Sequence, residues 1–250
     1  MTAVLSAQGT GLRLQLDRVR LSYTGTPIVD GLSLTVEPGE ILVLTGPSGC
    51  GKSTVLRALT GLLKPDAGQV LADGARVSTT SRDRGMVFQD SALLPWRTVR
   101  SNIELALKLR GHAKSGRRER AERWIDEVGL NGFADFLPKS LSGGMRQRVQ
   151  LARGLAGAPR ALMMDEPFAA LDAKTREAMQ HLLIDTWKAH PTTVVFVTHD
   201  VDEALTLGDR VAVLGRAGQP LRALLTVPSP RNTDLSRTEL RAEILGALHQ

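Results

Sequence analysis

The sequence predicts an α/β protein with a mostly parallel core sheet, an antiparallel β subdomain at the start and a helical subdomain in the middle. Three observations lead to this fold class. A continuous apolar run is followed by a Gly-rich turn and a helical pattern, and strand and helix patterns alternate in the second half. Aromatic residues make up only 4% of the 250 residues, so Leu, Val, Ile, Met and Ala must form the core.

The antiparallel layer is predicted from the first segment. Leu12, Leu14 and Leu16 alternate with polar residues, which is the period of a half-buried strand. A second strand over residues 32–36 ends at a Glu-Pro-Gly-Glu turn. The continuous apolar run 41–45 that follows is typical of a buried strand.

The next helical patterns lead into the helical subdomain. Residues 53–63 carry apolar side chains at the spacing of one helix face and stop before Lys64-Pro65. Between about residues 91 and 138 the apolar spacing is again helical, with one helix ending at Gly129. We expect a helical subdomain over approximately residues 90–157, within a single domain of residues 1–250.

The second half alternates helices and strands, which predicts parallel strands joined by right-handed crossovers. The expected segments are a helix over 144–156, a strand over 161–164, a helix over 173–188 with Asp172 as N-cap, a strand over 193–198 and a helix over 201–207. A hairpin-like pair, 211–214 and 221–227, and a terminal helix over 234–248 follow. Residues from about 215 to 250 should form a short C-terminal extension.

The charge balance favours anionic partners. The chain has 32 Lys and Arg against 26 Asp and Glu, a formal net charge of +6, which suits nucleotides, nucleic acid or an acidic membrane face. The densest basic run, residues 114–123, could contact phosphates, but it contains Glu119 and Glu122 and is typical of a solvated helix start. We expect no nucleic-acid partner.

Membrane insertion and disulfide formation are not expected. No secretory signal is recognisable at the start, and no apolar run approaches the ~20 residues of a spanning helix. The only cysteine is Cys50, so no disulfide can form within the chain and a reducing setting is suitable. Any membrane role should therefore be peripheral.

The turn after the run 41–45 fits the phosphate-binding loop (P-loop) pattern of Gly, four residues and Gly-Lys-Ser. The residues predicted to bind a nucleotide are Gly46, Pro47, Ser48, Gly49, Cys50, Gly51, Lys52, Ser53 and Thr54. Glycines let backbone N–H groups approach phosphates, and the following helix points its positive end at them. Lys52 would neutralise the β and γ phosphates of ATP, Ser53 would bind Mg²⁺, and Thr54 would support the α and β phosphates. A Gly-rich turn that binds nothing is the alternative.

Two carboxylates at the end of the predicted strand 161–164 supply the second half of the site. Asp165 can bind Mg²⁺ through water, and Glu166 is placed to polarise the attacking water as general base. An exposed Asp-Glu pair after a strand is the alternative. Behind a phosphate-binding loop, the catalytic interpretation is favoured.

Residues 141–148, Leu-Ser-Gly-Gly-Met-Arg-Gln-Arg, resemble the signature of the ATP-binding cassette (ABC) family. The resemblance implies that Ser142 and the backbone N–H groups of Gly143 and Gly144 receive a phosphate bound by a second subunit. It also implies a head-to-tail dimer of two copies that closes on two ATP molecules. Met145 replaces the commonest residue of the motif, Gln, and should leave the phosphate contacts unchanged.

Further residues match the family by position. Gln89 resembles the loop glutamine that senses Mg²⁺, the water and the membrane partner, and His199 resembles the switch histidine that contacts the γ phosphate. Asp172 resembles part of the loop that links the two sites across the dimer. Tyr23 occupies the position from which family members stack an aromatic ring on adenine, with a partly exposed strand-end tyrosine as the alternative.

The resemblance implies transport, because the features of other uses of the family are missing. Residues 53–140 contain no long coiled coil of the repair and chromosome type, and no second motor of the translation type is present. We expect the ATP-hydrolysing motor of an importer at the cytoplasmic face of the cell membrane. Its partners would be an integral membrane permease and an extracytoplasmic solute-binding protein. A non-transport ABC ATPase, or a regulatory subunit that barely hydrolyses ATP, is the competing interpretation.

The cargo group is suggested by residues 93–103, which include Leu-Pro-Trp at 94–96 and Asn102. They resemble the importers for nitrate, sulfonates and taurine, as do Met145 and the run Asp-Val-Asp-Glu-Ala at 200–204. The surface from Gln89 to Asn102 would then form the groove where the permease docks. Riboflavin- and pyrimidine-type importers are the alternative.

Overall fold

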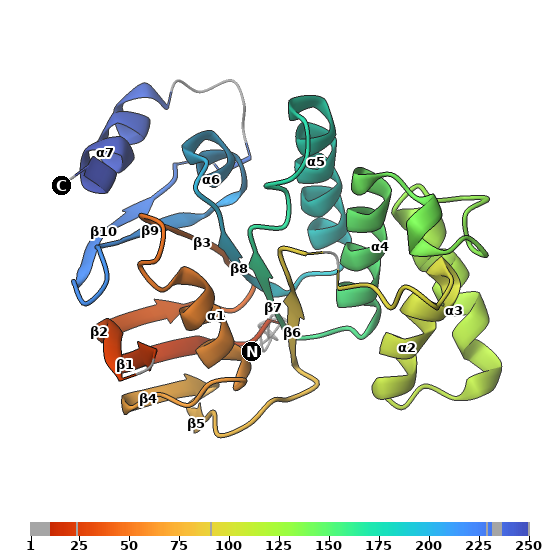
Figure 1. The fold of residues 1–250 in the computed structure, drawn as a ribbon, viewed down its shortest axis with the longest axis horizontal. Helices are drawn as coiled ribbons and strands as arrows, with labels where there is room; N and C mark the ends of the chain where they lie inside the picture. The colour runs from red at the N-terminus through yellow and green to blue at the C-terminus, as the bar shows by residue number, and fades with distance from the viewer. Residues whose placement is uncertain (1–10, 24, 91, 229, 232–236, 250) are drawn as a thin grey trace, which may run out of the picture.

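Two sheets and a set of helices make up the computed structural model, which describes residues 11–249 except 24, 91, 229 and 232–236 (Figure 1). The strands are β1 (Leu14–Tyr23), β2 (Thr26–Val36), β3 (Ile41–Thr45), β4 (Ala67–Ala72), β5 (Ala75–Arg76), β6 (Arg84–Val87), β7 (Ala161–Asp165), β8 (Thr193–Val197), β9 (Arg210–Leu214) and β10 (Leu221–Thr226). The helices are α1 (Lys52–Thr60), α2 (Val99–Leu109), α3 (Lys114–Glu127), the 3₁₀ helix η1 (Pro138–Ser140), α4 (Gly143–Ala156), α5 (Ala173–Ala189), α6 (Val201–Leu207) and α7 (Thr238–His249).

The larger sheet forms the core and has the strand order β10-β9-β3-β8-β7-β6. Its strands from β9 to β6 pair in parallel, while β10 runs antiparallel to β9. The smaller sheet, of order β2-β1-β4-β5, is antiparallel. These pairings confirm the predicted fold class, including the first antiparallel layer and the hairpin formed by β9 and β10.

The apolar core lies on both faces of the larger sheet. Every residue of β3, β7 and β8 is buried. Because side chains alternate along a strand, Leu42 and Leu44 of β3 join the cluster that contains α1, whereas Ile41 and Val43 join the cluster with α5 and α6. The sheet therefore holds the ends of its parallel strands at one rigid edge, as a site built there requires.

Helix α1 ends at Thr60 rather than at residue 63 as predicted. Gly61 has a φ of 81°, and a Cβ there would lie 2.3 Å from the carbonyl oxygen of Thr79. The chain turns away at this glycine, in the left-handed conformation that commonly ends helices. Leu62, expected on the apolar helix face, consequently lies 54% exposed.

Three strands were not predicted from the sequence. β4 and β5 complete the smaller sheet, and β6 forms one edge of the larger sheet. β6 has only four residues, among them Arg84 and Gly85, so neither alternation nor a long apolar run marks it. It forms because its backbone pairs with β7 along its whole length.

The middle of the chain contains the predicted helices, with irregular segments between them. α2, α3 and α4 pack around an apolar cluster of their own. Residues 92–98 and 128–137 are not helical, so the predicted helical pattern over 91–138 is too continuous. The basic run 114–123 lies in α3, which begins at Lys114.

The C-terminal helix begins at Thr238 rather than at residue 234. Residues 234–236 of the predicted helix lie outside the described residues, and Arg237 is not helical. Figure 1 shows α7 beside β10 and α6. No helix among the described residues is long and apolar enough to cross a membrane.

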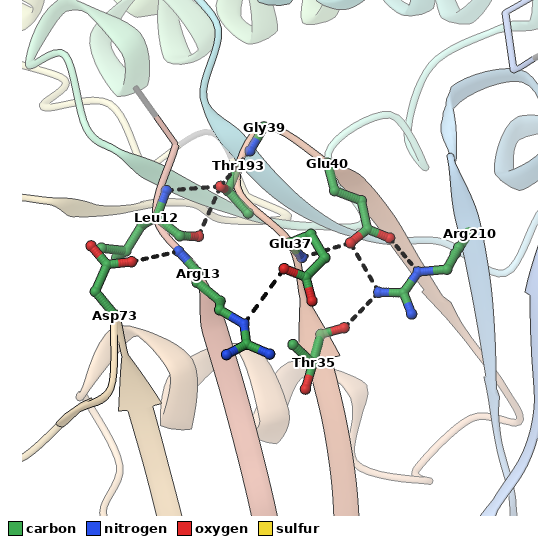
Figure 2. A network of polar contacts seen from close by, with 9 residues as sticks. All are labelled: Leu12, Arg13, Thr35, Glu37, Gly39, Glu40, Asp73, Thr193 and Arg210. Carbon is green, nitrogen blue, oxygen red and sulfur yellow. Dashed lines mark hydrogen bonds and ion pairs between the residues drawn. The ribbon is translucent and has the colours of Figure 1, made fainter. Parts of the chain in front are cut away.

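A network of polar contacts joins the two sheets (Figure 2). The buried Thr193 hydroxyl accepts hydrogen bonds from the N–H of Leu12, at 2.9 Å, and of Gly39, at 3.0 Å, and donates to the Leu12 carbonyl at 2.8 Å. Nearby, Arg210 of β9 binds both carboxylate oxygens of Glu40. One hydroxyl thus serves three main-chain groups from segments far apart in the sequence.

We expect Thr193→Val to lower the free energy of unfolding by about 1–3 kcal/mol, because the apolar side chain removes the hydroxyl that bonds the Gly39 N–H and the Leu12 carbonyl. The Leu12 N–H keeps its bond to the Arg160 carbonyl. Thr193→Ser keeps the hydroxyl and should cost less than about 1 kcal/mol. Urea unfolding of both variants gives the measurement. Equal losses would mean that the methyl packing, rather than the hydroxyl, stabilises this junction.

Candidate functional site

The loop between β3 and α1 contains the residues that the phosphate-binding pattern predicts. Gly46, Gly49 and Gly51 have φ values of 155°, 77° and 102°. A Cβ at Gly51 would lie only 2.6 Å from a methyl carbon of Val29. Glycine is therefore required at Gly51 both by backbone conformation and by space. Gly51 also precedes the first residue of α1, so main-chain N–H groups gather at the start of a nine-residue helix.

Lys52 is the first residue of α1, and its side chain folds back onto the loop. Its ammonium group donates to the carbonyl oxygens of Gly46, at 2.9 Å, and Pro47, at 3.0 Å. The side chain is buried, and both of its partners are neutral. An anionic phosphate would be a stronger acceptor than these carbonyls, so the ammonium is placed for phosphate binding.

Asp165 ends β7 and meets the start of α1. Its Oδ1 accepts a hydrogen bond of 2.8 Å from the Ser53 hydroxyl. Burial raises the pKa of this carboxyl above its usual value, and the Ser53 hydrogen bond opposes the shift. A hydroxyl and a partly desolvated carboxylate side by side are the hard oxygen ligands that Mg²⁺ prefers, so these two residues fit the predicted metal.

Glu166 follows Asp165 in an uncommon backbone conformation. Its φ is 41°, in the left-handed region, which costs a non-glycine residue about 1 kcal/mol or more. Its N–H donates to the carbonyl of Val197 at 3.1 Å, which ties the turn to the end of β8. Its Oε2 lies 3.0 Å from Nδ1 of His199, the side chain that follows β8. Two neighbouring strand ends therefore bring a carboxylate and an imidazole together.

A cavity of about 440 Å³ lies at the start of α1. It is lined by Ile28, Ser48, Gly49, Gly51, Lys52, Ser53, Thr54, Gln89 and Glu166. The structure thus brings six of the nine predicted loop residues together with Gln89, which follows β6, and with Glu166. Ile28 of β2 was not predicted, because no motif marks a single apolar residue in an antiparallel strand.

Cys50 lies in the loop but its thiol faces the core. The side chain is buried in the apolar cluster beside α1, and this burial raises the pKa of the thiol. Its N–H donates to the Pro47 carbonyl at 3.3 Å. Cys50 therefore contributes backbone to the loop and packing to the core.

The signature residues lie apart from this cavity. Ser142 caps α4, and its exposed hydroxyl accepts from the N–H of Met145 at 3.3 Å. Gly143 and Gly144 form the first turn, and a Cβ at Gly144 would lie 2.6 Å from a Thr175 methyl carbon. Among the described residues that line the cavity, none comes from this turn. The start of α4 is an open helix end that presents N–H groups outward.

The structure tests the prediction for Asp172 but not the one for Tyr23. Asp172 caps α5, accepting from the backbone N–H and the hydroxyl of Thr175, as the N-cap prediction required. Tyr23 is the last residue of β1, and its side chain lies outside the described residues. Adenine stacking by Tyr23 therefore stays a prediction.

Asn102 does not lie on the predicted docking surface of residues 89–102. The side chain is fully buried and bonds the backbone of Leu94, Arg97 and Thr98. By holding this loop, it presents Trp96, whose surface is 73% exposed. The amide is buried because a tight loop leaves main-chain groups that need partners.

Comparisons with known proteins agree with this geometry. Residues 29–169 match the family model described as ABC transporter. The chain is 43% identical over 226 residues to the nitrate import ATP-binding protein NrtD of Synechocystis sp., covering 89% of this chain and 85% of that protein. It is 46% identical over 192 residues to the taurine import ATP-binding protein TauB of Yersinia pestis bv. Antiqua, covering 77% and 75%.

A solved structure has the same fold. It is a dimeric ATP-binding cassette in a post-hydrolysis state, bound to ADP and phosphate. It superimposes with a TM-score of 0.77 at 32% sequence identity, and the match covers 86% of this chain and 99% of that one.

Proposed function

The chain belongs to the ABC transporter family and is the ATP-hydrolysing motor subunit of an importer, and from this premise we propose that it drives uptake of nitrate, a sulfonate or taurine. The cargo proposal is supported by the nitrate and taurine import proteins among the relatives of this chain. The observation that carries the motor function is the cavity where Lys52, Gln89 and Glu166 meet. Riboflavin- or pyrimidine-type cargo is the alternative.

In the proposed site, the loop from Gly46 to Thr54 cradles the phosphates of ATP. Lys52 exchanges its two loop carbonyls for phosphate oxygens, so its ammonium group is hydrogen-bonded both without and with the nucleotide. Ser53 and Asp165, with Gln89, would hold Mg²⁺, which would neutralise charge that builds on the phosphates. The N–H groups at the start of α1 add their dipoles to the same end of the nucleotide.

We assign the proton transfer to Glu166. Glu166 lines the cavity, and its carboxylate can accept a proton from a water that attacks the terminal phosphate. His199, whose Nδ1 lies 3.0 Å from Oε2, restrains the carboxylate through this hydrogen bond, and we propose that its ring contacts the same phosphate. The uncommon backbone conformation of Glu166 holds the side chain at this strand end.

The proposed active form is a head-to-tail dimer. Ser142 and Gly143 are exposed and Gly144 is half-buried at the start of α4, and none of the three lines the cavity of their own subunit. A second copy can offer its own signature to this cavity and receive this one in return, which is an interface with two-fold symmetry. The dimeric cassette with the same fold supports this proposal.

We further propose that the chain binds a separate membrane permease at the cytoplasmic face of the membrane, with a solute-binding protein as an additional partner. The exposed indole of Trp96, held out by the Asn102 bonds, is the main apolar contact offered by residues 89–102. Phe88, 37% exposed, lies just before this segment.

We expect Trp96→Ala to weaken permease binding by about 30-fold or more, because buried tryptophans dominate such interfaces. ATP binding by the isolated chain should be unchanged. Leu224→Ala, on β10 at the opposite edge of the larger sheet, is the control. Affinity capture of the permease from detergent extracts measures the difference, and equal capture by both variants would place the docking surface elsewhere.

The function as a whole is tested by purifying the chain from its native membranes and identifying its partners by mass spectrometry. We expect a stoichiometric multi-span membrane protein and, with the solute-binding protein, uptake of nitrate, sulfonates or taurine in reconstituted vesicles. Uptake of riboflavin or pyrimidines instead would overturn the cargo assignment. Ribosomal or nucleic-acid partners in place of a permease would contradict the transport role.

A further inference from the structure

His199 is an exposed side chain on a buried support. The side chain is 66% exposed, yet its Nδ1 lies 3.0 Å from Oε2 of Glu166. Thr198, directly before it, is 2% exposed, and its N–H donates to the Leu44 carbonyl of β3 at 3.2 Å. Holding an exposed side chain in one place costs conformational entropy. The direction of the imidazole therefore depends on how firmly the turn beneath it is held.

The turn after His199 has the sequence spacing of a capping box. Asp200 is the N-cap of α6, and its Oδ1 accepts from the N–H groups of Asp202, at 2.9 Å, and Glu203, at 3.1 Å. In a capping box, the acid three residues into the helix reaches back to the N–H of the cap residue. Here the N–H of Asp200 donates to the Thr198 hydroxyl at 3.0 Å, and the carboxylate of Glu203 bonds that hydroxyl. The hydroxyl thus lies between the two halves of the box.

Glu203 is buried, although glutamate side chains rarely are. It is 5% exposed, and Gln180 of α5 donates to its Oε1 at 3.1 Å. Burial raises the pKa of this carboxyl, and the hydrogen bonds from Thr198 and Gln180 oppose the shift. Arg176, which also favours the charged form, pairs with Asp200 at 3.2 Å instead. The buried charge is therefore held mainly by two neutral donors.

This arrangement holds the turn that carries His199 from two sides. Thr198 follows β8, Gln180 lies on α5 and Glu203 lies on α6, so three elements meet at one carboxylate. Hydrogen bonds in a buried, low-dielectric site are stronger than exposed ones. Without the carboxylate, the Thr198 hydroxyl loses its acceptor and is free to turn away from the N–H of Asp200. The turn would then loosen while the sheet beneath it stays intact.

We propose that Glu203 is a positioning residue for His199, an inference that rests on the proposed ATP site. Through the Thr198 hydroxyl, its carboxylate fixes the backbone from which the imidazole is directed at Glu166 and, with ATP bound, at the terminal phosphate. Glu203 is not among the described residues that line the cavity. Its loss should therefore slow hydrolysis and leave nucleotide binding unchanged.

The test compares three variants of α6. Glu203→Met removes the carboxylate but keeps the length and helix propensity of the side chain. Glu203→Gln keeps an oxygen that accepts from the Thr198 hydroxyl. Asp202→Asn is the matched control, because this neighbouring carboxylate is 70% exposed and pairs with Arg241.

We expect kcat for ATP hydrolysis to fall about 10- to 50-fold in Glu203→Met, because a catalytic group displaced by about 1 Å loses up to about 10²-fold in rate. The Kd of Mg-ATP should stay within about twofold, since the residues that bind the nucleotide are untouched. Glu203→Gln should recover kcat to within about threefold of the parent, because a neutral acceptor bonds the hydroxyl more weakly than a carboxylate. Asp202→Asn should match the parent. Recovery by Gln but not by Met, which has the same length, separates the hydrogen bond from packing.

The imidazole can also be followed directly, without nucleotide. The chain has five histidines, so NMR correlation peaks of the rings are few, and the His199 peak is the one missing in His199→Gln. In Glu203→Met we expect this peak to move toward the position of a histidine in an unfolded chain, because the ring no longer lies beside Glu166. In Glu203→Gln and Asp202→Asn it should stay where it is in the parent protein.

An unmoved His199 peak in Glu203→Met, or a kcat equal to that of the parent, would overturn the inference. So would equal losses in Glu203→Met and Glu203→Gln, because the charge rather than the hydrogen bond would then matter. If Glu203→Met melts much lower than the parent, Thr198→Val removes the same hydrogen bond from its other end and should give the same two results. Failure of the parent chain to bind Mg-ATP, or hydrolysis by His199→Gln at the parent rate, would instead contradict the proposed ATP site.

Discussion

Glu166→Gln should lower kcat for ATP hydrolysis by about 10²- to 10⁴-fold, because the amide cannot accept the proton of the attacking water. The substitution keeps the size of the side chain and its hydrogen-bond contact to His199, so the cavity should keep its shape. Phosphate release measures the loss.

Binding of ATP should survive the same substitution. Lys52, Ser53 and Asp165 are untouched, and we expect the variant to accumulate as an ATP-bound dimer that size-exclusion chromatography with light scattering detects. Glu177→Gln, an exposed carboxylate on α5, is the control and should hydrolyse ATP normally. Hydrolysis by Glu166→Gln at a rate near that of this control would remove Glu166 from the general-base role.

Lys52→Ala should weaken Mg-ATP binding by about 30-fold or more, because it removes charge-assisted hydrogen bonds in a buried site. Equilibrium titration with a fluorescent ATP analogue measures the change. The isolated fold should also lose some stability, since the Gly46 carbonyl loses the ammonium donor and the Pro47 carbonyl keeps only the Cys50 N–H.

The stability effect must be separated from the binding effect. Lys64→Ala removes an exposed lysine just beyond α1 and should leave the affinity unchanged. Titration of Lys52→Ala is done well below its melting temperature, so that the chain is folded in every sample. Undiminished affinity in Lys52→Ala would contradict the assignment of residues 46–54 as the phosphate-binding loop.

Much of the fold could be predicted from local patterns. The runs 41–45, 161–164 and 193–198 are buried throughout, so they stand out as apolar whatever surrounds them. β6 could not be predicted in this way. It is short, contains Arg84 and Gly85 and lies at a sheet edge, so its structure depends on pairing with β7.

The candidate site, like the fold, could be predicted from local patterns only in part. Gly51, Lys52 and Asp165 were predicted because the loop and the strand end are short motifs with strict chemical requirements. Ile28 was not predicted, because it comes from an antiparallel strand and lines the cavity only through the way the fold places that strand. Asn102 was assigned to the wrong environment for this reason as well, since a buried amide and an exposed one look alike in sequence.

The junction at Thr193 has a consequence for how the chain is made on the ribosome. β1 can pair with β2 and β4 as soon as those neighbours have emerged, but Leu12 bonds the Arg160 carbonyl and the Thr193 hydroxyl. At about 5–20 residues per second, β8 leaves the ribosome many seconds after β1. During this interval the antiparallel layer is only partly formed, because the strand on which it docks has not yet been synthesised. The nascent chain is therefore most exposed to aggregation, and most in need of a chaperone, before β8 has been synthesised.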